Sequence, residues 1–495
     1  MAVKQYMNIM TELENTGQVE NNIASKRSQA DNIVSLLCDS EYEFFIDQKD
    51  DLYAMYQTNG HQETRRCNTE EFKGMISLLY WDTHNKTVQA GAIRDALGVL
   101  HGKALRTGKR YVLDHRLRWD RSTLCYDLTD ESWEYIAVNE NEGWFTIPAS
   151  EPLFKREKHS KPQVKPVKGG DIKTLLSFVN IAKEEEELLF LVYLISCFIP
   201  DFPHPIAYFY GPQGSAKSTM SRLLKSLIDP SLIDVSQTPT NEQDLDHVLE
   251  HHWFIAFDNL SFLSERMSDS LCKAVTGVSS SKRKLYTDDE YVIYNYKRCI
   301  ALNGINLLAL KPDLLERSIL FELERVDKSK RELEDDFWKR FEEEKPKILG
   351  AIFSIVWEAL RIKPTVSLPN RPRMADFAVW GYAIAEAMNR QGDAFICAYE
   401  ENIKRQTMEI LYEHPTASAL SVFMEDKDYW EGTASKLLDE LHFLVNTESK
   451  YRKLPETPNA LSRSIAQIKL TLEEGGIRFS RKDGKVRSII LERMK

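Results

Sequence analysis

The sequence predicts an α/β fold in which a parallel sheet surrounds a phosphate-binding loop. Three observations lead to this prediction. The apolar run 206–210 passes directly into the loop GPQGSAKST and then into an amphipathic helix. Two further apolar runs, 253–258 and 298–303, each end in a polar residue, as buried parallel strands do beside a ligand site. The 495 residues are enough for about two to four domains.

Composition excludes several classes of protein. Apolar residues make up 42% of the chain and charged residues 28%, which is typical of soluble globular proteins. The seven cysteines are scattered and none forms a CxxC pair, which argues against a zinc site or a disulfide framework and favours a reducing compartment. The longest apolar run, around 188–200, is too short for a membrane span, and the N-terminus lacks a signal-peptide pattern. We therefore expect a cytoplasmic protein without membrane contact.

The charge distribution favours local contacts with nucleic acid. The net charge of −10 argues against a general nucleic-acid coat. Residues 155–173 and 451–495, however, carry net charges of +5 and +6. Such basic segments on an acidic body can bind phosphates locally.

The loop after the first apolar run carries the strongest functional signal. Gly211 and Gly214 let backbone amides turn toward phosphates. Lys217 places a positive charge between the β- and γ-phosphates, and Ser218 offers a hydroxyl to Mg²⁺ at a helix N-terminus. The expected nucleotide-binding residues are Gly211, Pro212, Gln213, Gly214, Ser215, Ala216, Lys217, Ser218 and Thr219. The alternative interpretation is a Gly-Ser turn followed by an ordinary helix cap.

One position departs from the usual spacing of such loops. A second glycine normally precedes the lysine, and Ala216 stands there instead. Its methyl group is tolerable if φ stays negative, but it can crowd the phosphate.

Polar residues at the ends of the next two strands extend the candidate site. Asp258 is expected to hold Mg²⁺, and Asn259 stands where a second carboxylate would polarise the attacking water. Because Asn orients water but cannot act as a base, this departure bears on the rate of hydrolysis. Asn303 ends the third strand, where it can contact the γ-phosphate and the lytic water.

Arg317 follows Asn303 by fourteen residues, on a short predicted helix before a strand at 319–323. An arginine in this place can reach the γ-phosphate held by a neighbouring subunit. The alternative, which spacing alone favours, is a surface arginine paired with Asp313 or Glu316.

The ordered set GPQGSAKST, FIAFDN, ALNG and KPDLLERS resembles the AAA+ ATPases of the superfamily 3 helicase kind. More closely, it resembles the ATPase part of phage, plasmid and integrative-element replication proteins, the poxvirus-type primase–helicases among them. The segments LYTDDE, PRMADFAVWG and WEGTA are also similar to that group, and the resemblance runs from about residue 44 to the C-terminus.

The resemblance implies an AAA+ P-loop core with ATP and Mg²⁺ as cofactors. It implies that Ser218 and Asp258 hold the metal and that the catalytic residues are Lys217, Asp258, Asn259, Asn303 and Arg317. It further implies a homohexameric ring on single-stranded or forked DNA. Since no primase site is visible, a separate primase or polymerase is the expected further partner.

Three functions are compatible with these residues. The first is an ATP-driven, DNA-translocating ring of a mobile element's replication apparatus, and the complete set with Arg317 favours it. The second is a nucleotide-gated initiator or loader with weak turnover, which Ala216 and Asn259 favour. The third is an NTPase of a phage-defence or packaging system.

Two basic regions are candidates for DNA contact. A hairpin with arms at 283–286 and 291–294 would line the pore of a ring, or it is an ordinary surface hairpin with an acidic tip. Helices at 433–445 and 457–474, followed by a hairpin over 477–491, resemble a winged helix that binds DNA or, alternatively, protein. The expected DNA-binding residues are Lys282, Arg283, Lys284, Arg463, Lys469, Arg481, Lys482, Lys485 and Arg487.

These patterns divide the chain into six parts. The expected parts are a helical or disordered arm (1–40), an N-terminal α+β domain (41–153), a basic linker (154–170), an AAA+ ATPase core with a helical lead-in at 171–200 (171–326), a helical collar or lid (327–428) and a C-terminal winged helix (429–495).

Overall fold

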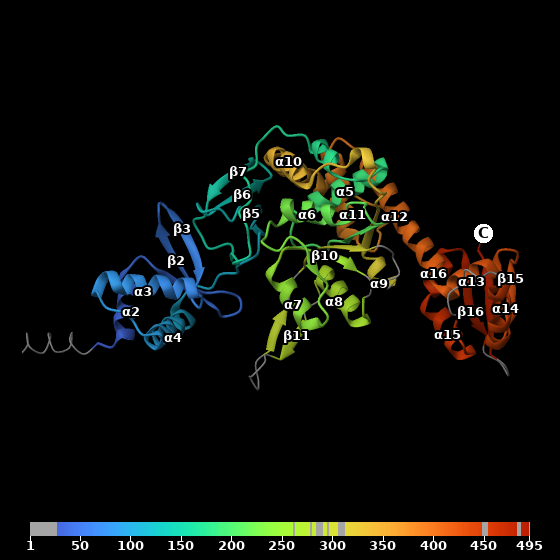
Figure 1. Cartoon of the computed structure of the whole chain (residues 1–495), viewed down its shortest axis with the longest axis horizontal. Helices are drawn as coiled ribbons and strands as arrows, with labels where there is room; N and C mark the ends of the chain where they lie inside the picture. The colour runs from blue at the N-terminus through green and yellow to red at the C-terminus, as the bar shows by residue number, and fades with distance from the viewer. Residues whose placement is uncertain are drawn as a thin grey trace, which may run out of the picture. The chain divides into compact units, whose positions relative to one another are not determined.

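A computed structural model describes residues 27–260, 263–277, 280–283, 291–294, 297–304, 312–447, 454–482 and 487–494. The chain forms two compact units (Figure 1). The first comprises Met1–Ala137 and Phe145–Pro162, and the second comprises Val138–Trp144 and Gln163–Lys495. One division between the units thus falls inside the segment 154–170 that is predicted to be a linker.

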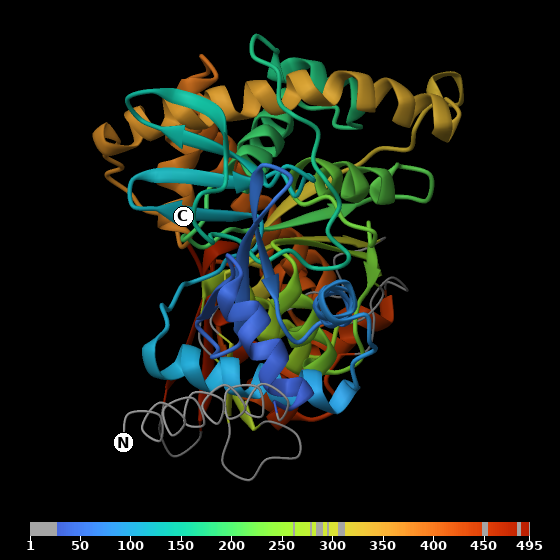
Figure 2. The same cartoon turned by 90° about the vertical axis from the view of Figure 1, so that its left-hand side faces the viewer.

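The described part of the first unit contains two sheets and three helices, and the helices are blue to light blue in Figure 2. Ile33, Phe72 and Ile93 come from different helices and share one core with Ala54 of the first sheet. The elements are α2 (Gln29–Asp39), β1 (Glu43–Ile46), β2 (Leu52–Thr58), β3 (His61–Arg66), α3 (Glu70–His84), α4 (Ala90–Thr107), β4 (Leu117–Asp120), β5 (Thr123–Asp127), β6 (Glu134–Asn139) and β7 (Gly143–Pro148). The sheet orders are β1-β2-β3 and β4-β5-β6-β7.

The second unit contains a five-stranded sheet with the order β14-β8-β13-β10-β9. Its strands are β8 (Ile206–Tyr210), β9 (Ser236–Gln237), β10 (Phe254–Leu260), β13 (Cys299–Gly304) and β14 (Ser318–Glu322). All of these pairings are parallel, which confirms the predicted parallel sheet. The chain leaves β8 for the far edge at β9 and later returns to both neighbours of β8. The carboxyl end of β8 is therefore a topological switch point, where open α/β sheets bind ligands.

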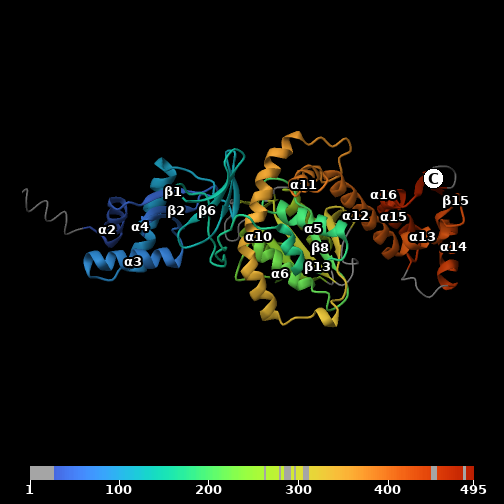
Figure 3. The same ribbon diagram turned by 90° about the horizontal axis from the view of Figure 1, so that it is seen from above.

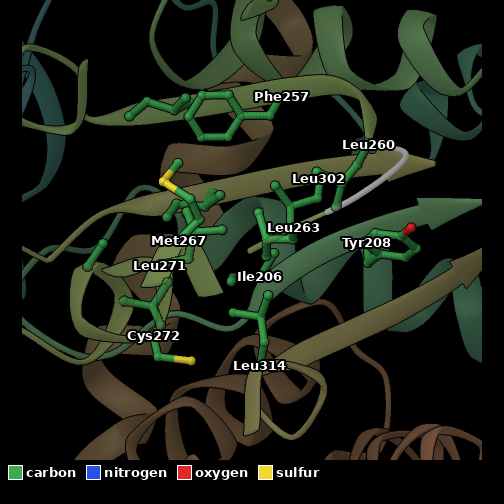
Figure 4. Close-up of a cluster of buried hydrophobic side chains, with 14 of the residues drawn as sticks. Ile206, Tyr208, Phe257, Leu260, Leu263, Met267, Leu271, Cys272, Leu302 and Leu314 are labelled. Atoms are coloured by element: carbon green, nitrogen blue, oxygen red, sulfur yellow. The ribbon is translucent and has the colours of Figure 1, made fainter. Parts of the chain in front are cut away.

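Helices cover both faces of this sheet. On one face, Tyr208 and Phe257 pack with Leu271 of α8 in a single core (Figure 4). On the other face, the rings of Phe209 and of Phe190 of α5 lie 6.4 Å apart between centroids. The helices are α5 (Glu184–Ser196), α6 (Lys217–Ile228), α7 (Glu242–His251), α8 (Glu265–Thr276) and α9 (Pro312–Leu315), and the 3₁₀ helix η1 (Ile172–Phe178) precedes them. Alternate side chains along a strand thus pack against the helices on opposite faces of the sheet.

Helix α12 (Gly392–Glu413) covers the edge of the sheet at β14. Asn402 accepts a hydrogen bond from the Leu320 amide at 2.9 Å and donates one to the Leu320 carbonyl at 2.7 Å. Gln406 donates to the Ser318 carbonyl at 2.6 Å, and Arg405 donates to the Leu320 carbonyl at 2.7 Å. These side chains satisfy backbone groups that an edge strand otherwise leaves unpaired.

A single long helix, α10 (Glu334–Ile362), lies within the region predicted to be a helical collar or lid, and it is drawn in orange in Figure 3. Between α10 and α12 lies α11 (Ala375–Ala387). Among the residues that the structure describes, no helix has both the length and the apolar character needed to cross a membrane.

The end of the segment predicted to be a linker packs against the second unit. The Val167 amide donates to the Pro346 carbonyl of α10 at 2.8 Å, and a Cβ on Gly350 would lie 1.8 Å from the Val167 carbonyl. Gln163 donates to the Leu227 carbonyl at the end of α6 at 2.8 Å. Residues 163–167 are therefore held in place by specific hydrogen bonds, despite their linker-like composition.

The described part of the C-terminal region contains four helices and a small antiparallel sheet with the order β15-β17-β16. Its elements are α13 (Pro415–Met424), β15 (Tyr429–Gly432), α14 (Ala434–Thr447), α15 (Pro458–Gln467), α16 (Lys469–Glu474), β16 (Ile477–Lys482) and β17 (Ser488–Arg493). The single helix predicted over 457–474 is in fact two helices that meet at Ile468. Leu461, Ile468 and Leu491 share one core, which explains the continuous apolar pattern.

The hairpin predicted between the second motif and the third strand is present as β11 (Ser280–Arg283) and β12 (Tyr291–Tyr294). Its first arm begins three residues before the predicted one. Lys284 and the acidic tip lie outside the described residues.

Candidate nucleotide-binding site

The loop predicted to bind phosphate joins β8 to α6 at the switch point of the sheet. Gly211 has φ of 144°, and a Cβ there would lie 2.1 Å from the Leu323 carbonyl. The chain after β14 runs beside the loop: the Leu323 amide donates to the Tyr210 carbonyl at 2.8 Å, and the Val326 amide donates to the Gly214 carbonyl at 3.1 Å. Glycine is therefore required at position 211 both by its φ and by this close approach.

Asn180 also fixes the loop, and sequence reasoning missed it. Its Nδ2 donates to the Ser215 carbonyl at 3.1 Å and to the Glu324 carbonyl at 2.6 Å. One side chain thus links the loop to the segment that follows β14. Both acceptors are backbone carbonyls, which every residue has. The types of the neighbouring residues therefore do not indicate this role of Asn180.

Lys217 is the first residue of α6 and folds back over the loop. Its Nζ donates to the carbonyls of Gly211 and Pro212 at 2.7 and 2.8 Å and contacts the Ser215 hydroxyl at 3.3 Å. Burial lowers the pKa of Lys217, and the nearby charge of Asp258 opposes that shift. The ammonium is thus centred on the concave side of the loop, where phosphate oxygens can replace its carbonyl partners.

Ser218 and Asp258, the two residues predicted to hold a metal, are in contact. The Ser218 hydroxyl lies 3.1 and 3.0 Å from the two carboxylate oxygens of Asp258. A hydroxyl and a carboxylate are hard oxygen donors of the kind that Mg²⁺ prefers, and Mg²⁺ is usually held by one or two carboxylates with water and substrate phosphates. The donor set of this chain therefore fits the ion.

Asn259 and Asn303 are joined by a hydrogen bond across neighbouring strands. The backbone amide of Asn259 donates to Oδ1 of Asn303 at 2.8 Å, and Nδ2 of Asn303 donates to the Ser221 hydroxyl of α6 at 3.2 Å. Asn303 is only 1% exposed, so its amide group is locked in one orientation. It connects β13, β10 and the helix that follows the loop.

Ala216 has φ of 66° and ψ of 26°, in the left-handed region. The condition of a negative φ, under which a methyl group is tolerable in this position, is therefore not met. A left-handed conformation costs an alanine roughly 1–2 kcal/mol, and a glycine adopts it freely.

Replacing Ala216 by glycine is expected to raise the free energy of unfolding by about 1 kcal/mol, because it removes this strain. Urea denaturation measures the change. Ala394→Gly, at an exposed position in helix α12, is the matched control and is expected to lower stability by up to about 1 kcal/mol. A loss of stability in Ala216→Gly would contradict the assignment of strain to this residue.

Arg317 lies at the opposite end of the sheet from the loop. Its carbonyl accepts a hydrogen bond from the Ile206 amide at 2.8 Å, at the amino end of β8. The loop begins after Tyr210, about 16 Å further along the strand. The guanidinium donates to the backbone carbonyl of Asp313 at 2.7 Å and also binds its carboxylate. Within one chain, the structure thus pairs Arg317 with Asp313 and does not bring it to the loop.

The C-terminal candidates for DNA contact differ in their partners. Lys469 pairs with Glu473 at 3.7 Å, and Lys482 pairs with Glu431 at 3.5 Å. Arg463 is exposed on α15.

The remaining candidates lie in or beside hairpins. Arg481 donates to the Ser462 carbonyl at 2.7 Å, which ties the C-terminal hairpin to α15, and Arg487 directly precedes β17. Lys282 and Arg283 belong to β11, whereas Lys284 and Lys485 lie outside the described residues.

Solved structures share a distant likeness with the chain. The A form apo structure of the NrS-1 C-terminal region is 11% identical and covers 94% of this chain and 98% of its own, with a TM-score of 0.39. A second apo structure of the same region is 12% identical and covers 95% and 100%, with a TM-score of 0.41. These values are too low to support an argument about function. A search of curated proteins gave no significant match.

Two family models match the sequence itself. Residues 172–401 match the actinomycete integrative conjugative element replication protein, and residues 416–495 match the AICE RepA C-terminal domain. The first match contains the loop, Asp258, Asn303 and Arg317, and the second contains α15 and the C-terminal sheet. Both matches lie in the second unit, where the chain is therefore similar to the replication proteins of actinomycete integrative conjugative elements.

Proposed function

We propose that the chain is a ring-forming AAA+ ATPase of the superfamily 3 kind, which moves along DNA during replication of the element. The observation that carries this proposal is the meeting of Lys217, Ser218 and Asp258 at the carboxyl end of β8. A phosphate-binding lysine, a hydroxyl and a carboxylate converge there beside the N-terminus of α6. Such a constellation suits a nucleoside triphosphate with a divalent cation.

Each residue of the site has a separate task in ATP hydrolysis. The amides of the loop and the Lys217 ammonium bind the phosphates. Ser218 and Asp258 would hold Mg²⁺, which neutralises charge on the phosphate oxygens when bound. Asn259, whose backbone Asn303 holds, orients the attacking water but cannot accept its proton.

The position of Arg317 supports a ring. An arginine at the amino end of β14 lies too far from its own loop to bind the same nucleotide. Its side chain is 16% exposed in the single chain, and through this exposed part it can complete the site of a neighbouring copy, where it stabilises charge at the γ-phosphate. A homohexamer around single-stranded or forked DNA is the proposed assembly, and a separate primase or polymerase is its proposed partner.

A nucleotide-gated initiator with weak turnover is the second candidate. Asn259 favours it, because an amide stands where a general base would speed hydrolysis. The left-handed Ala216 favours it as well, because a glycine is usual in this position of a phosphate-binding loop and an alanine adopts the conformation at a cost.

The decisive experiment measures ATP hydrolysis by the full chain with and without forked DNA, together with negative-stain imaging in a non-hydrolysable ATP analogue. A translocating ring predicts six-membered particles and hydrolysis that DNA stimulates. Rings or filaments on DNA with slow, unstimulated hydrolysis would support the initiator instead. Monomers that hydrolyse no ATP under any condition would contradict both candidates.

Arg463 is expected to contact a DNA phosphate or base edge, because it is exposed on α15 in a positively charged region. The variant Arg463→Ala should weaken duplex binding and, where the contact is to phosphate, reduce the slope of log K against log salt by about 1. Fluorescence anisotropy across a salt series measures both. Lys436→Ala is the matched control, since this exposed lysine on α14 pairs with Glu440 and is not among the expected DNA-binding residues. Unchanged affinity in Arg463→Ala would favour a protein-binding role for this region.

A further inference from the structure

We infer that Arg373 acts with Arg317 as a second cationic finger, so that two arginines of one copy bind the terminal phosphate of a nucleotide held by the next. This inference rests on the proposed ring. Arg373 lies between α10 and α11, 56 residues after Arg317 in the sequence. The fold nevertheless brings the two guanidinium groups to one carboxylate.

The shared partner is Asp313 of helix α9, which precedes β14. Arg373 Nη2 lies 2.8 Å from Oδ1 of Asp313, and Arg317 Nη1 binds the same oxygen atom. Arg373 also forms an ion pair with Glu316. The shared carboxylate offsets the repulsion between the two positive charges. The pair of arginines therefore forms a ready site for an anion, and a carboxylate of the same chain occupies it.

A phosphate from outside can take the place of that carboxylate. The Asp313 side chain is 52% exposed and the Arg373 side chain 45% exposed, whereas the Arg317 side chain is 16% exposed, so the cluster opens to solvent on the side of Asp313 and Arg373. A terminal phosphate offers three oxygens and about two negative charges, which suits two planar guanidinium groups better than one carboxylate oxygen does. In a single chain, the ionised Asp313 thus occupies the position that the phosphate of a neighbouring subunit's nucleotide would take.

The ionisation of Asp313 follows from its neighbours. Partial burial acts to raise its pKa, but hydrogen bonds from Arg317 and Cys272 outweigh burial and hold the pKa below its ordinary value. The carboxylate is therefore charged at neutral pH. It keeps both guanidinium groups oriented before the subunits meet.

Arg373 cannot serve the loop of its own chain. Its two partners, Asp313 and Glu316, precede β14, and the loop lies at the carboxyl end of the neighbouring β8. Its phosphate partner must therefore come from a second copy. The alternative is a structural ion pair that holds the loop before α11 to α9.

The test compares Arg373→Ala, Arg373→Lys and Arg317→Ala with the parent in the full chain. For Arg373→Ala, ATP affinity should stay within about twofold, and turnover should fall about 10- to 100-fold, a smaller loss than removal of a main oxyanion donor. Mixing Arg373→Ala with Lys217→Ala should restore part of the hydrolysis. Arg361→Ala, which removes an exposed arginine paired with Glu358, is the control and should leave turnover unchanged.

The outcomes separate this inference from the proposed function. If Arg317→Ala loses turnover and Arg373→Ala does not, the ring stands and the second finger is wrong. If neither variant changes turnover, the trans arrangement itself is wrong. Should Arg373→Ala fail to fold, Arg373→Lys decides, because it keeps the positive charge but loses the paired N–H donors of the planar guanidinium. If Arg373 binds a neighbour's phosphate, this variant should have reduced turnover. If Arg373 is a structural ion pair, the variant should keep the parental turnover.

Discussion

Arg317→Ala is expected to keep near-normal ATP affinity and to lose turnover by roughly 10³-fold. The reason is geometric, because the residue lies about 16 Å along the sheet from the loop of its own chain and so takes no part in binding there. Its loss removes charge stabilisation at a neighbour's γ-phosphate. Equilibrium binding of a labelled ATP analogue and steady-state hydrolysis measure the two effects separately.

Mixing provides the strongest form of this test. When Arg317→Ala and Lys217→Ala are combined, some interfaces pair an intact loop with an intact arginine, so two inactive proteins should regain part of the hydrolysis. Size-exclusion chromatography establishes that the two variants assemble together. If they assemble and no activity returns, Arg317 is a cis ion-pair partner of Asp313, as the single chain shows it.

Lys217→Ala is expected to lower the affinity for Mg·ATP by at least about 10²-fold, since each charge-assisted hydrogen bond to phosphate contributes roughly 1.5–3 kcal/mol. The folded chain should tolerate the change, because the lysine's present partners are carbonyls and a hydroxyl at the partly exposed loop. Isothermal titration calorimetry with a non-hydrolysable analogue measures the loss. Lys339→Ala, at an exposed position on α10, is the control. Hydrolysis at the parental rate in Lys217→Ala would refute the assignment of the site.

Local pattern was sufficient to predict the centre of the second unit. The apolar run before the glycines became β8, and the amphipathic run after Lys217 became α6. The contact between Ser218 and Asp258 followed from parallel strands whose carboxyl ends meet at one edge. These predictions depend only on residue type: apolar residues indicate the buried layers, and glycine, lysine, serine and aspartate indicate the phosphate and metal ligands.

Features set by tertiary structure could not be predicted in this way. The left-handed φ of Ala216 depends on how the loop is pinned between Asn180 and the chain after β14. The hydrogen bonds of Asn402 at the edge of the sheet join a side chain to backbone groups. Because every residue has such backbone groups, no partner residue in the sequence indicates these contacts. The break at Ile468 was hidden because residues on both sides of it serve one core.

The covered edge at β14 has a consequence for how copies of the chain can meet. Amide side chains already occupy the backbone groups that a strand from another molecule would need, and the opposite edge, β9, offers only the pair Ser236–Gln237. The sheet therefore has no free template on which it could grow by strand addition. Association must instead use side-chain surfaces, whose contacts slide and re-form with little cost to the backbone. In the proposed ring, such side-chain interfaces would let neighbouring copies change their arrangement without breaking backbone pairing.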